Sequence, residues 1–434
     1  MSQRSHARRG DKGTLPRTDP VAVQGRLALE RGRVLPRGPR PDERPPYACP
    51  PSLARAALAP GLALALAGPA AAQTIPELEW PLLGGTLELY GQINRGVLVY
   101  DDGRQTEVYP FVDAANSNSR IGLRFEKDFR TWSFENVYEI GYDPYSTGRV
   151  NVVDDSISDQ EWQLQKSNIR RIDFIFHFAQ FGDLSVGQGG MATDGVAERD
   201  LSGTGLVASS ALADSASGQL FRFTGAGGPG SISGVSVGDA FANFDGSRRV
   251  RVRYDTPRFA GFGVSASYGR DLLNDSRAVR EQNLFDASLS YVGGFGDFAL
   301  QGATGMALRD DNDARYLASA TTLHKPTGLN LTLAGGLTEG EASFVYTKVG
   351  ITRDLVSWGS TSFSVDYYTG DDVNLDAGAG ITSSSSDSYG LAVVQKIDAA
   401  NLEVYATYRN YDYSDNSADY SDGDAVFTGV RFRF

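Results

Sequence analysis

The chain has 434 residues, with 41 basic and 53 acidic side chains, a net charge of −12 and one cysteine. This acidic balance disfavours nucleic acid as a partner, because phosphate groups attract basic surfaces. No run of 18 apolar residues occurs after residue 73, which excludes a helical membrane protein. A membrane β-barrel is not excluded, because only every second residue of its strands faces lipid.

The first 72 residues have the layout of an export signal behind a leader. Residues 1–50 are rich in Arg and Pro without periodicity, so we expect no folded domain there. A start codon assigned too far upstream is one explanation, and a disordered leader is the alternative. Residues 53–73 then combine the basic Arg55, an apolar stretch and small residues before Gln73. We predict cleavage after residue 72 rather than a membrane anchor, because the apolar run is short and contains Pro60.

The segment that remains, 73–434, carries 29 basic and 48 acidic side chains, a net charge of −19. The only cysteine, Cys49, lies in the part removed. We therefore expect no disulfide, no thiol nucleophile and no thiolate metal site in the exported protein.

Alternating apolar and polar residues predict sixteen strands in this segment. They lie at about 86–99, 119–128, 132–143, 168–179, 183–188, 248–256, 261–270, 283–293, 297–307, 314–324, 328–338, 343–353, 358–369, 387–397, 401–412 and 424–434.

Short and long connections alternate between these strands. Tight turns such as FRTW (129–132) and KPTG (325–328) alternate with long polar segments, of which 189–247 is the longest. Such hairpins put all turns at one end and all loops at the other, as in outer-membrane barrels, and sixteen strands leave room for an aqueous channel. The alternation within strands also suits a soluble sandwich, so it does not decide the class by itself.

Three stretches and the last residue carry a family resemblance. They are SNSRIGL (117–123), GDLSVGQGGMATDGVAERDLSGTG (182–205), YDTPRFAGFGVSASYG (254–269) and the terminal Phe434. On these residues most of 86–434 resembles the Gram-negative general porins, in particular their alphaproteobacterial branch. The Pro-Glu-Phe-Gly-Gly loop tip of the enteric members is absent, so the detailed shape of their constriction is not carried over.

The resemblance implies an all-β fold, a 16-stranded antiparallel transmembrane β-barrel with an inward-folded third loop at 189–247. It also implies a homotrimer in the outer membrane of a Gram-negative bacterium, surrounded by lipid and inserted by the barrel-assembly machinery, which reads Phe434 as its signal. The expected function is passive diffusion of small hydrophilic solutes and ions through a water-filled pore.

A constriction is expected where basic wall residues face acidic loop residues. Fixed opposite charges across a narrow mouth orient water and dipolar solutes, although Arg199 on the loop weakens this scheme. With the net charge of −19 on the exported segment, we expect weak selectivity tipped toward cations. The predicted set comprises Arg120, Arg124, Arg171, Arg249, Arg251, Arg253, Arg431 and Arg433 on the strands and Asp194, Glu198, Asp200 and Asp214 on the loop.

Two other functions remain open at this point. A substrate-selective channel on the same barrel would need a ladder of aromatic side chains along the lumen. A secreted soluble β-sandwich or adhesin would be extracted without detergent. An enzyme is not expected, since 73–434 holds only His177 and His324 and no H-x-x-x-H pattern.

No cofactor is expected either. Acidic clusters at 310–313, 371–372 and 412–424 offer the oxygen ligands that Ca²⁺ uses, but none has the EF-hand spacing. Solvated loop surfaces are the preferred interpretation of these clusters.

Overall fold

The computed structural model describes residues 78–154, 164–225, 228–274, 276–310, 314–340, 342–376 and 378–434. The predicted leader and signal peptide, 1–72, lie outside these ranges. Strands make up most of the regular structure that is described. Within the same ranges, no helix has the length and hydropathy needed to cross a membrane.

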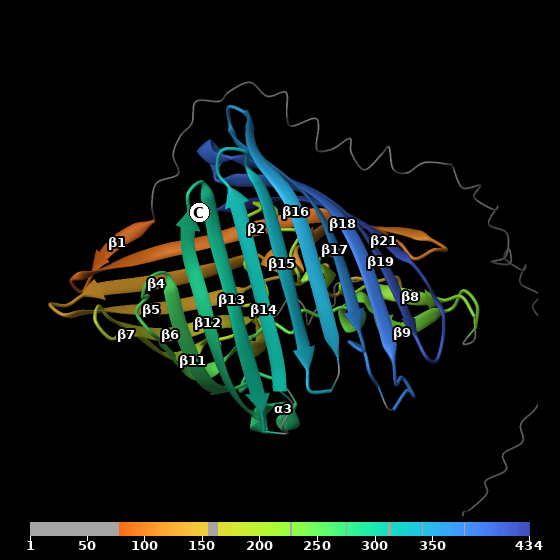
Figure 1. Cartoon of the computed structure of the whole chain (residues 1–434), viewed down its shortest axis with the longest axis horizontal. Helices are drawn as coiled ribbons and strands as arrows, with labels where there is room; N and C mark the ends of the chain where they lie inside the picture. The colour runs from red at the N-terminus through yellow and green to blue at the C-terminus, as the bar shows by residue number, and fades with distance from the viewer. Residues whose placement is uncertain are drawn as a thin grey trace, which may run out of the picture. The chain divides into compact units, whose positions relative to one another are not determined.

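Sixteen antiparallel strands close into a barrel (Figure 1). Each pairs with the next barrel strand along the chain, and the last closes on the first, with Phe432 opposite Ile93. The predicted strands and fold are confirmed, and predicted ends differ from observed ones by no more than about three residues, within the error expected of pattern reading. The strands are β2 (Gly85–Asp101), β4 (Arg120–Asp128), β5 (Trp132–Gly141), β6 (Ile169–Phe178), β7 (Gly182–Gly190), β10 (Arg248–Asp255), β11 (Phe262–Arg270), β12 (Asn283–Phe295), β13 (Phe298–Arg309), β14 (Ala314–His324), β15 (Leu329–Thr338), β16 (Ser343–Val356), β17 (Gly359–Asp371), β18 (Ser384–Ile397), β19 (Leu402–Asp415) and β21 (Gly423–Arg433).

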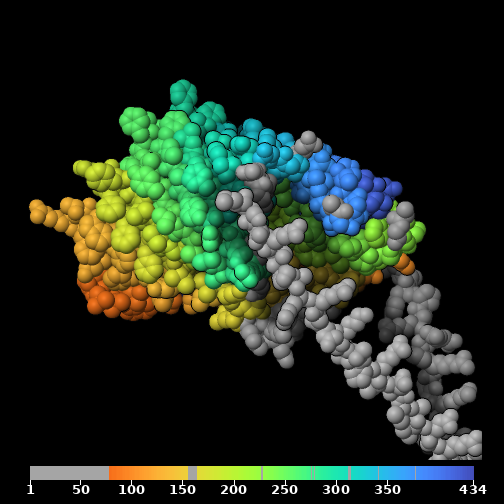
Figure 2. Space-filling model, turned by 90° about the horizontal axis from the view of Figure 1, so that it is seen from below, coloured from red at the N-terminus to blue at the C-terminus, as the bar shows by residue number. Residues whose placement is uncertain are grey.

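Apolar side chains cover the outside of the barrel. On β4, Ile121 and Leu123 are exposed, while the alternate residues of this strand face the lumen. Figure 2 shows the strands following one another around the surface in chain order, from orange through green to blue. Phe181, Phe259 and Phe295 are highly exposed beside the tight turns. Aromatic residues in this position form the girdle at a membrane interface.

Two tight turns require glycine. Gly182 and Gly328 have φ values of +87° and +68°, and an added Cβ would collide with the carbonyl oxygen of Asp255 or Thr352. Both the left-handed backbone and the close approach exclude other side chains there. These glycines keep the hairpin ends short.

The first strand has more partners than its neighbours. Its Thr86–Gln92 part pairs with β4, but Arg95–Asp101 pairs with β3 (Thr106–Asp113), which doubles back from the first loop. A short β1 (Glu79–Leu82) pairs with the beginning of β2. The sequence analysis missed both strands: β1 precedes the first predicted strand, and β3 lies in the connection between the first two predicted strands.

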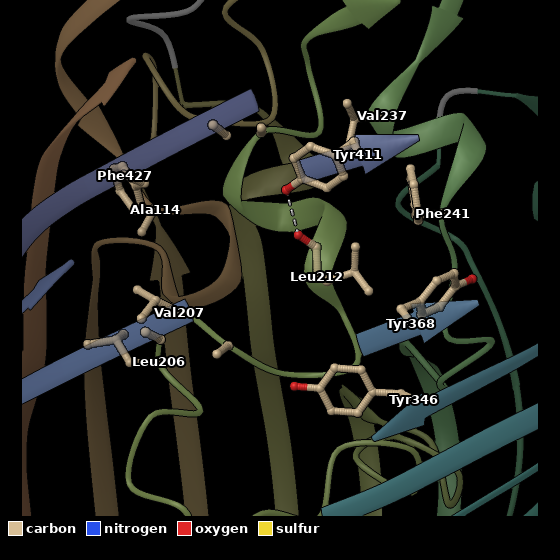
Figure 3. Packing of buried hydrophobic residues seen from close by; sticks show 14 of the residues in the cluster. Ala114, Leu206, Val207, Leu212, Val237, Phe241, Tyr346, Tyr368, Tyr411 and Phe427 are labelled. Atoms are coloured by element: carbon tan, nitrogen blue, oxygen red, sulfur yellow. Dashed lines mark hydrogen bonds between the residues drawn. The ribbon is translucent and has the colours of Figure 1, made fainter. Parts of the chain in front are cut away.

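The long segment between β7 and β10, residues 191–247, folds into the barrel as predicted. Figure 3 shows Leu206, Val207 and Leu212 of this inward loop lying among wall tyrosines, and Tyr411 Oη donates a hydrogen bond to the Leu212 carbonyl oxygen (2.9 Å). Within the loop lie η5 (Leu212–Ser215), β8 (Leu220–Phe223), β9 (Ile232–Ser236) and α2 (Val237–Ala240).

A small second sheet joins two loops. β8 and β9 form a hairpin, and β20 (Tyr420–Ser421), from the loop between β19 and β21, adds to β8. The Arg222 guanidinium pairs with Asp102 of the first loop, so three loops are tied together at the loop end of the barrel. The other short elements are η3 (Ala115–Ser117), η4 (Lys166–Asn168), α3 (Arg277–Glu281) and η6 (Asp398–Ala400).

Candidate functional site

A cavity of about 830 Å³ opens along the lumen wall of β4 to β7, β10 and β11. Its lining is dominated by charge, with seven arginines, five carboxylates and one histidine. Asp194 belongs to the inward loop and Arg258 to the turn after β10, whereas the other charged residues come from barrel strands or their ends. The arginines are Arg120, Arg170, Arg171, Arg248, Arg251, Arg253 and Arg258, and the carboxylates are Glu139, Asp173, Asp183, Asp194 and Asp255.

Five of the twelve predicted constriction residues line this cavity: Arg120, Arg171, Arg251, Arg253 and Asp194. The other seven lie elsewhere. They are Arg124, Arg249, Arg431, Arg433, Glu198, Asp200 and Asp214.

Carboxylates of the wall itself hold the central arginines. Arg251 forms two 2.7 Å bonds to the carboxylate of Asp173, and both side chains are almost fully buried. Arg171 reaches the same carboxylate at 3.2 Å. Arg253 pairs with Asp255 at 2.8 Å and donates to the Met191 carbonyl oxygen at 2.7 Å. The expected division into a basic wall and an acidic loop is therefore too simple, because the wall supplies both charges.

Arg170 enters the lumen because the pairing of β5 with β6 is irregular. The register shifts between Glu139 and Ile140, and Arg170 Nε reaches Glu139 Oε1 at 2.5 Å. Arg120 lies 4.0 Å from the same carboxylate, which also accepts a hydrogen bond from Tyr90 (3.0 Å). Strict alternation points Arg170 outward, so sequence reading missed it, and a bulge of this kind leaves no clear signal in a single sequence.

Arg248 takes the place that was expected for Arg249. Arg248 lines the cavity, whereas Arg249 lies outside the lining and approaches Asp271 at 3.9 Å. Both stand at the end of the β7–β10 ladder, opposite Gly190 and Gly189. Alternation does not determine the facing of side chains where a ladder ends, because the strand no longer has partners on both sides.

Asp194 is the loop carboxylate that does face the arginines. Burial raises the pKa of Asp194 above its ordinary value, and the nearby cations Arg248 and Arg253 oppose that effect. Of the four loop carboxylates that were predicted to face the arginines, Asp194 is the one in the cavity lining.

The remaining predicted arginines sit on the lumen register and are paired there. Arg124 binds Glu88 at 2.9 Å and Glu135 at 3.3 Å. Arg431 binds Glu403 at 2.6 Å, and Arg433 approaches the same carboxylate at 3.7 Å.

Asp200 is taken up in holding the loop. Lys348 of β16 donates to its carboxylate at 2.8 Å. Burial alone would raise the pKa of Asp200, but the Lys348 ammonium lowers it below its ordinary value. The neighbouring Arg199 lies near charges of both signs: burial and then Arg258 lower its pKa, and Asp245 acts in the opposite direction.

The other loop acids form a crowded group. Glu198 accepts a hydrogen bond from Asn243 (2.9 Å). Burial, and then Glu198, raise the pKa of Asp214 to about 7. The same two causes raise the pKa of Asp245 to about 8, although the backbone N–H groups of Gly195 and Ala197 donate to it and act in the opposite direction. Sequence reading missed Asp245.

Aromatic side chains do line part of the barrel interior, but the loop covers them. Tyr346, Tyr368, Tyr405, Tyr411 and Phe427 are at most 1% exposed and pack in the cluster with the loop (Figure 3). None of these rings is in the lining of the cavity, so a solute there does not meet them.

Both histidines have hydrogen-bonding partners close to them in the chain or across the sheet. His177 lines the cavity between Asp183 (3.0 Å) and Glu135 (3.3 Å), and His324 bonds to Thr327 at a tight turn. Among the described residues, no three or more of His, Cys, Asp and Glu gather as metal ligands. Residues 311–313 of one acidic cluster lie outside the described ranges.

Comparison with known proteins identifies a family. The model of the Gram-negative porins matches residues 54–416, and no curated protein matches the chain. An anion-selective porin from Comamonas acidovorans is 14% identical, with a TM-score of 0.52, over 81% of this chain and 100% of that one. The high-pH structure of OprB from Pseudomonas putida is 11% identical, with a TM-score of 0.51, over 81% and 94%. At such identities the likeness shows the fold.

Proposed function

The chain belongs to the family of Gram-negative porins, and from this premise we propose that its arginine-lined cavity is the constriction of a pore that prefers small anions. The protein is an outer-membrane channel through which small hydrophilic solutes diffuse passively. The preference for anions is the part that the family does not supply.

The charge of the lining carries this proposal. Seven arginines stand against five carboxylates, and the remaining lining charge is His177. Arg248 and Arg258 form no ion pair with a described residue; Arg258 donates only to the Gly261 carbonyl oxygen (3.1 Å). Cations without a direct ion pair attract anions over a Debye length of about 8–10 Å, which is comparable to a pore radius. The excess of acidic residues in 73–434 argues for cations, but a constriction selects by the charges nearest to the solute.

We further propose a passive, non-enzymatic channel that works without a cofactor and assembles as a homotrimer through the barrel-assembly machinery. The exposed apolar outer face supports a lipid environment. The covered tyrosines count against the alternative of a selective channel with an aromatic track.

Reversal potentials in planar bilayers under a salt gradient test the ion preference. Purified protein should form channels whose reversal potential shows a preference for anions over cations. This preference should be larger with small anions of high mobility. A cation-side value would refute the preference while leaving the channel intact. Absence of any channel from folded protein in the outer-membrane fraction would refute the pore itself.

A further inference from the structure

Hydroxyl side chains of the barrel wall bind the backbone of the inward loop. Ser319 Oγ accepts a hydrogen bond from the Arg199 N–H and Thr321 Oγ1 accepts one from the Leu201 N–H, each at 3.2 Å. On β16, Thr352 Oγ1 donates to the Ser202 carbonyl oxygen at 2.8 Å. Because these side chains are small, the loop backbone can lie close against the strands and still satisfy its polar groups.

One cation lies within this array of hydroxyls. The Lys348 side chain is fully buried, and its ammonium donates to Asp200 at 2.8 Å and to the Ala208 carbonyl oxygen at 2.6 Å. Thr332 Oγ1 donates to the other oxygen of Asp200 at 3.1 Å. The ammonium therefore binds two separate points of the loop.

Asp200 is the residue that neutralises the positive charge of Lys348. Besides Asp200, the charges that act on Lys348 are Asp366 and Arg409, which form an ion pair at 2.7 Å with both side chains fully buried. Because that pair is neutral in sum, the Lys348 charge has Asp200 as its counter-ion. A buried cation that loses its partner is strongly disfavoured, so the loop segment at Asp200 is held in one place.

We propose that Lys348 is the positioning residue that fixes the inward loop and thereby sets the width of the pore. The inference rests on the proposed pore function and adds what determines its open state. Since Arg199 directly precedes Asp200, the same contact also holds the Arg199 cation among the charges that act on it, which are Arg258, Asp245, Arg253 and Asp194. Without it, the loop should leave the wall in rare excursions that narrow the cavity.

Single-channel recording of the full-length protein in planar bilayers tests this. In Lys348→Met and in Asp200→Asn, we expect brief closures to become about ten times more frequent, which corresponds to about 1.4 kcal/mol. The double variant should add little, because both changes remove the same contact. Lys348→Arg keeps the charge and should restore most of the quiet open state, a result that a merely space-filling role does not predict.

Lys127→Met is the matched control, since Lys127 lies at the turn end and donates to the Leu83 carbonyl oxygen, away from the loop. If Lys348→Met does not assemble, Asp200→Asn decides, because it changes only the loop. Closure rates equal to those of the parent in folded Asp200→Asn would overturn the proposal. This result is distinct from failure of the pore, in which the parent protein would itself conduct nothing.

Discussion

The lumen wall has two halves that differ in chemistry and in what covers them. From β4 to β11 the inward-facing residues include arginines and carboxylates, and they border an open cavity. From β13 to β19 they are mainly serine, threonine and tyrosine, and the inward loop lies on them. Each half of the wall suits what it faces. Charged groups are solvated by the water of the cavity, and hydroxyl groups can form hydrogen bonds with the backbone of the inward loop.

The few charged side chains in the covered half form ion pairs, as this division requires. Arg409 has Asp366 and Lys348 has Asp200, and each of these cations is fully buried. A charge under the loop without a partner would lose its hydration without compensation. Around the open half, by contrast, pairs such as Arg124–Glu88 are partly exposed, so solvent can replace a lost partner there, and the buried Arg251–Asp173 pair is an exception.

The largest expected effect is the difference between two variants, each of which removes one carboxylate that binds an arginine. Asp366→Asn leaves Arg409 buried without a counter-ion and should lower the free energy of unfolding by about 3–5 kcal/mol. Glu88→Gln, on β2 at the border of the open half, removes one partner of Arg124 on β4 and should cost less than about 1 kcal/mol, because Arg124 is partly solvated and keeps Glu135 at 3.3 Å. Denaturant titrations in lipid vesicles measure both, and similar losses would show that the two halves do not differ.

The seam at which the covered half meets the first strand supplies the second test. Phe434 exchanges backbone hydrogen bonds with Gly91 of β2 (2.9 and 3.1 Å) and lies beside Phe432. Deleting Phe434 should reduce the yield of folded barrel in cells. Refolding into detergent should suffer less if lost recognition by the assembly machinery is the main cause. Normal yields in cells would contradict the role of Phe434 as a signal.

The sequence predicts the barrel well because one signal, alternation, repeats in every strand. Loop 191–247 was also expected inside, but that expectation came from family resemblance and not from its residues. β3, β8, β9 and β20 were missed, because short strands inside loops pair with partners that local periodicity does not reveal.

The candidate site was harder to predict than the fold. Residues in the middle of a ladder, such as Arg251 and Arg253, lie on the lumen side that alternation predicts. Arg170 and Arg248 were missed, since a register shift and a ladder end reverse the expected facing. Asp200 was misassigned, because its partner Lys348 is distant in sequence and only the fold brings them together.

A smaller effect should separate neighbouring arginines of the open half. Arg248→Gln combined with Arg258→Gln removes two cations that line the cavity without an ion pair to a described residue. The reversal potential should move toward cations, with the fold intact. Arg249→Gln is the control for the Arg248→Gln part of this variant, because it makes the same single change one position away and outside the lining. An equal shift in the control would mean that the constriction lies elsewhere.

The smallest expected effect is a dependence of loop attachment on pH. The pKa of Asp214 is raised to about 7 and that of Asp245 to about 8, by burial and then by Glu198. A carboxyl with a raised pKa takes up its proton more readily in the folded protein than in the unfolded chain. Its contribution to stability is therefore full below about pH 4 and lost as the pH rises through 7 to 8.

Protease should thus cut the inward loop faster at pH 9 than at pH 6. Asp245→Asn should flatten this dependence, because the amide stays neutral and can still accept an N–H hydrogen bond from Gly195 or Ala197. Asp422→Asn, on an exposed outer loop, serves as the control and should keep the slope of the parent. If Asp245→Asn also keeps that slope, the crowded loop acids do not weaken the covered half, and the hydroxyls and Lys348 alone determine how firmly the loop is held.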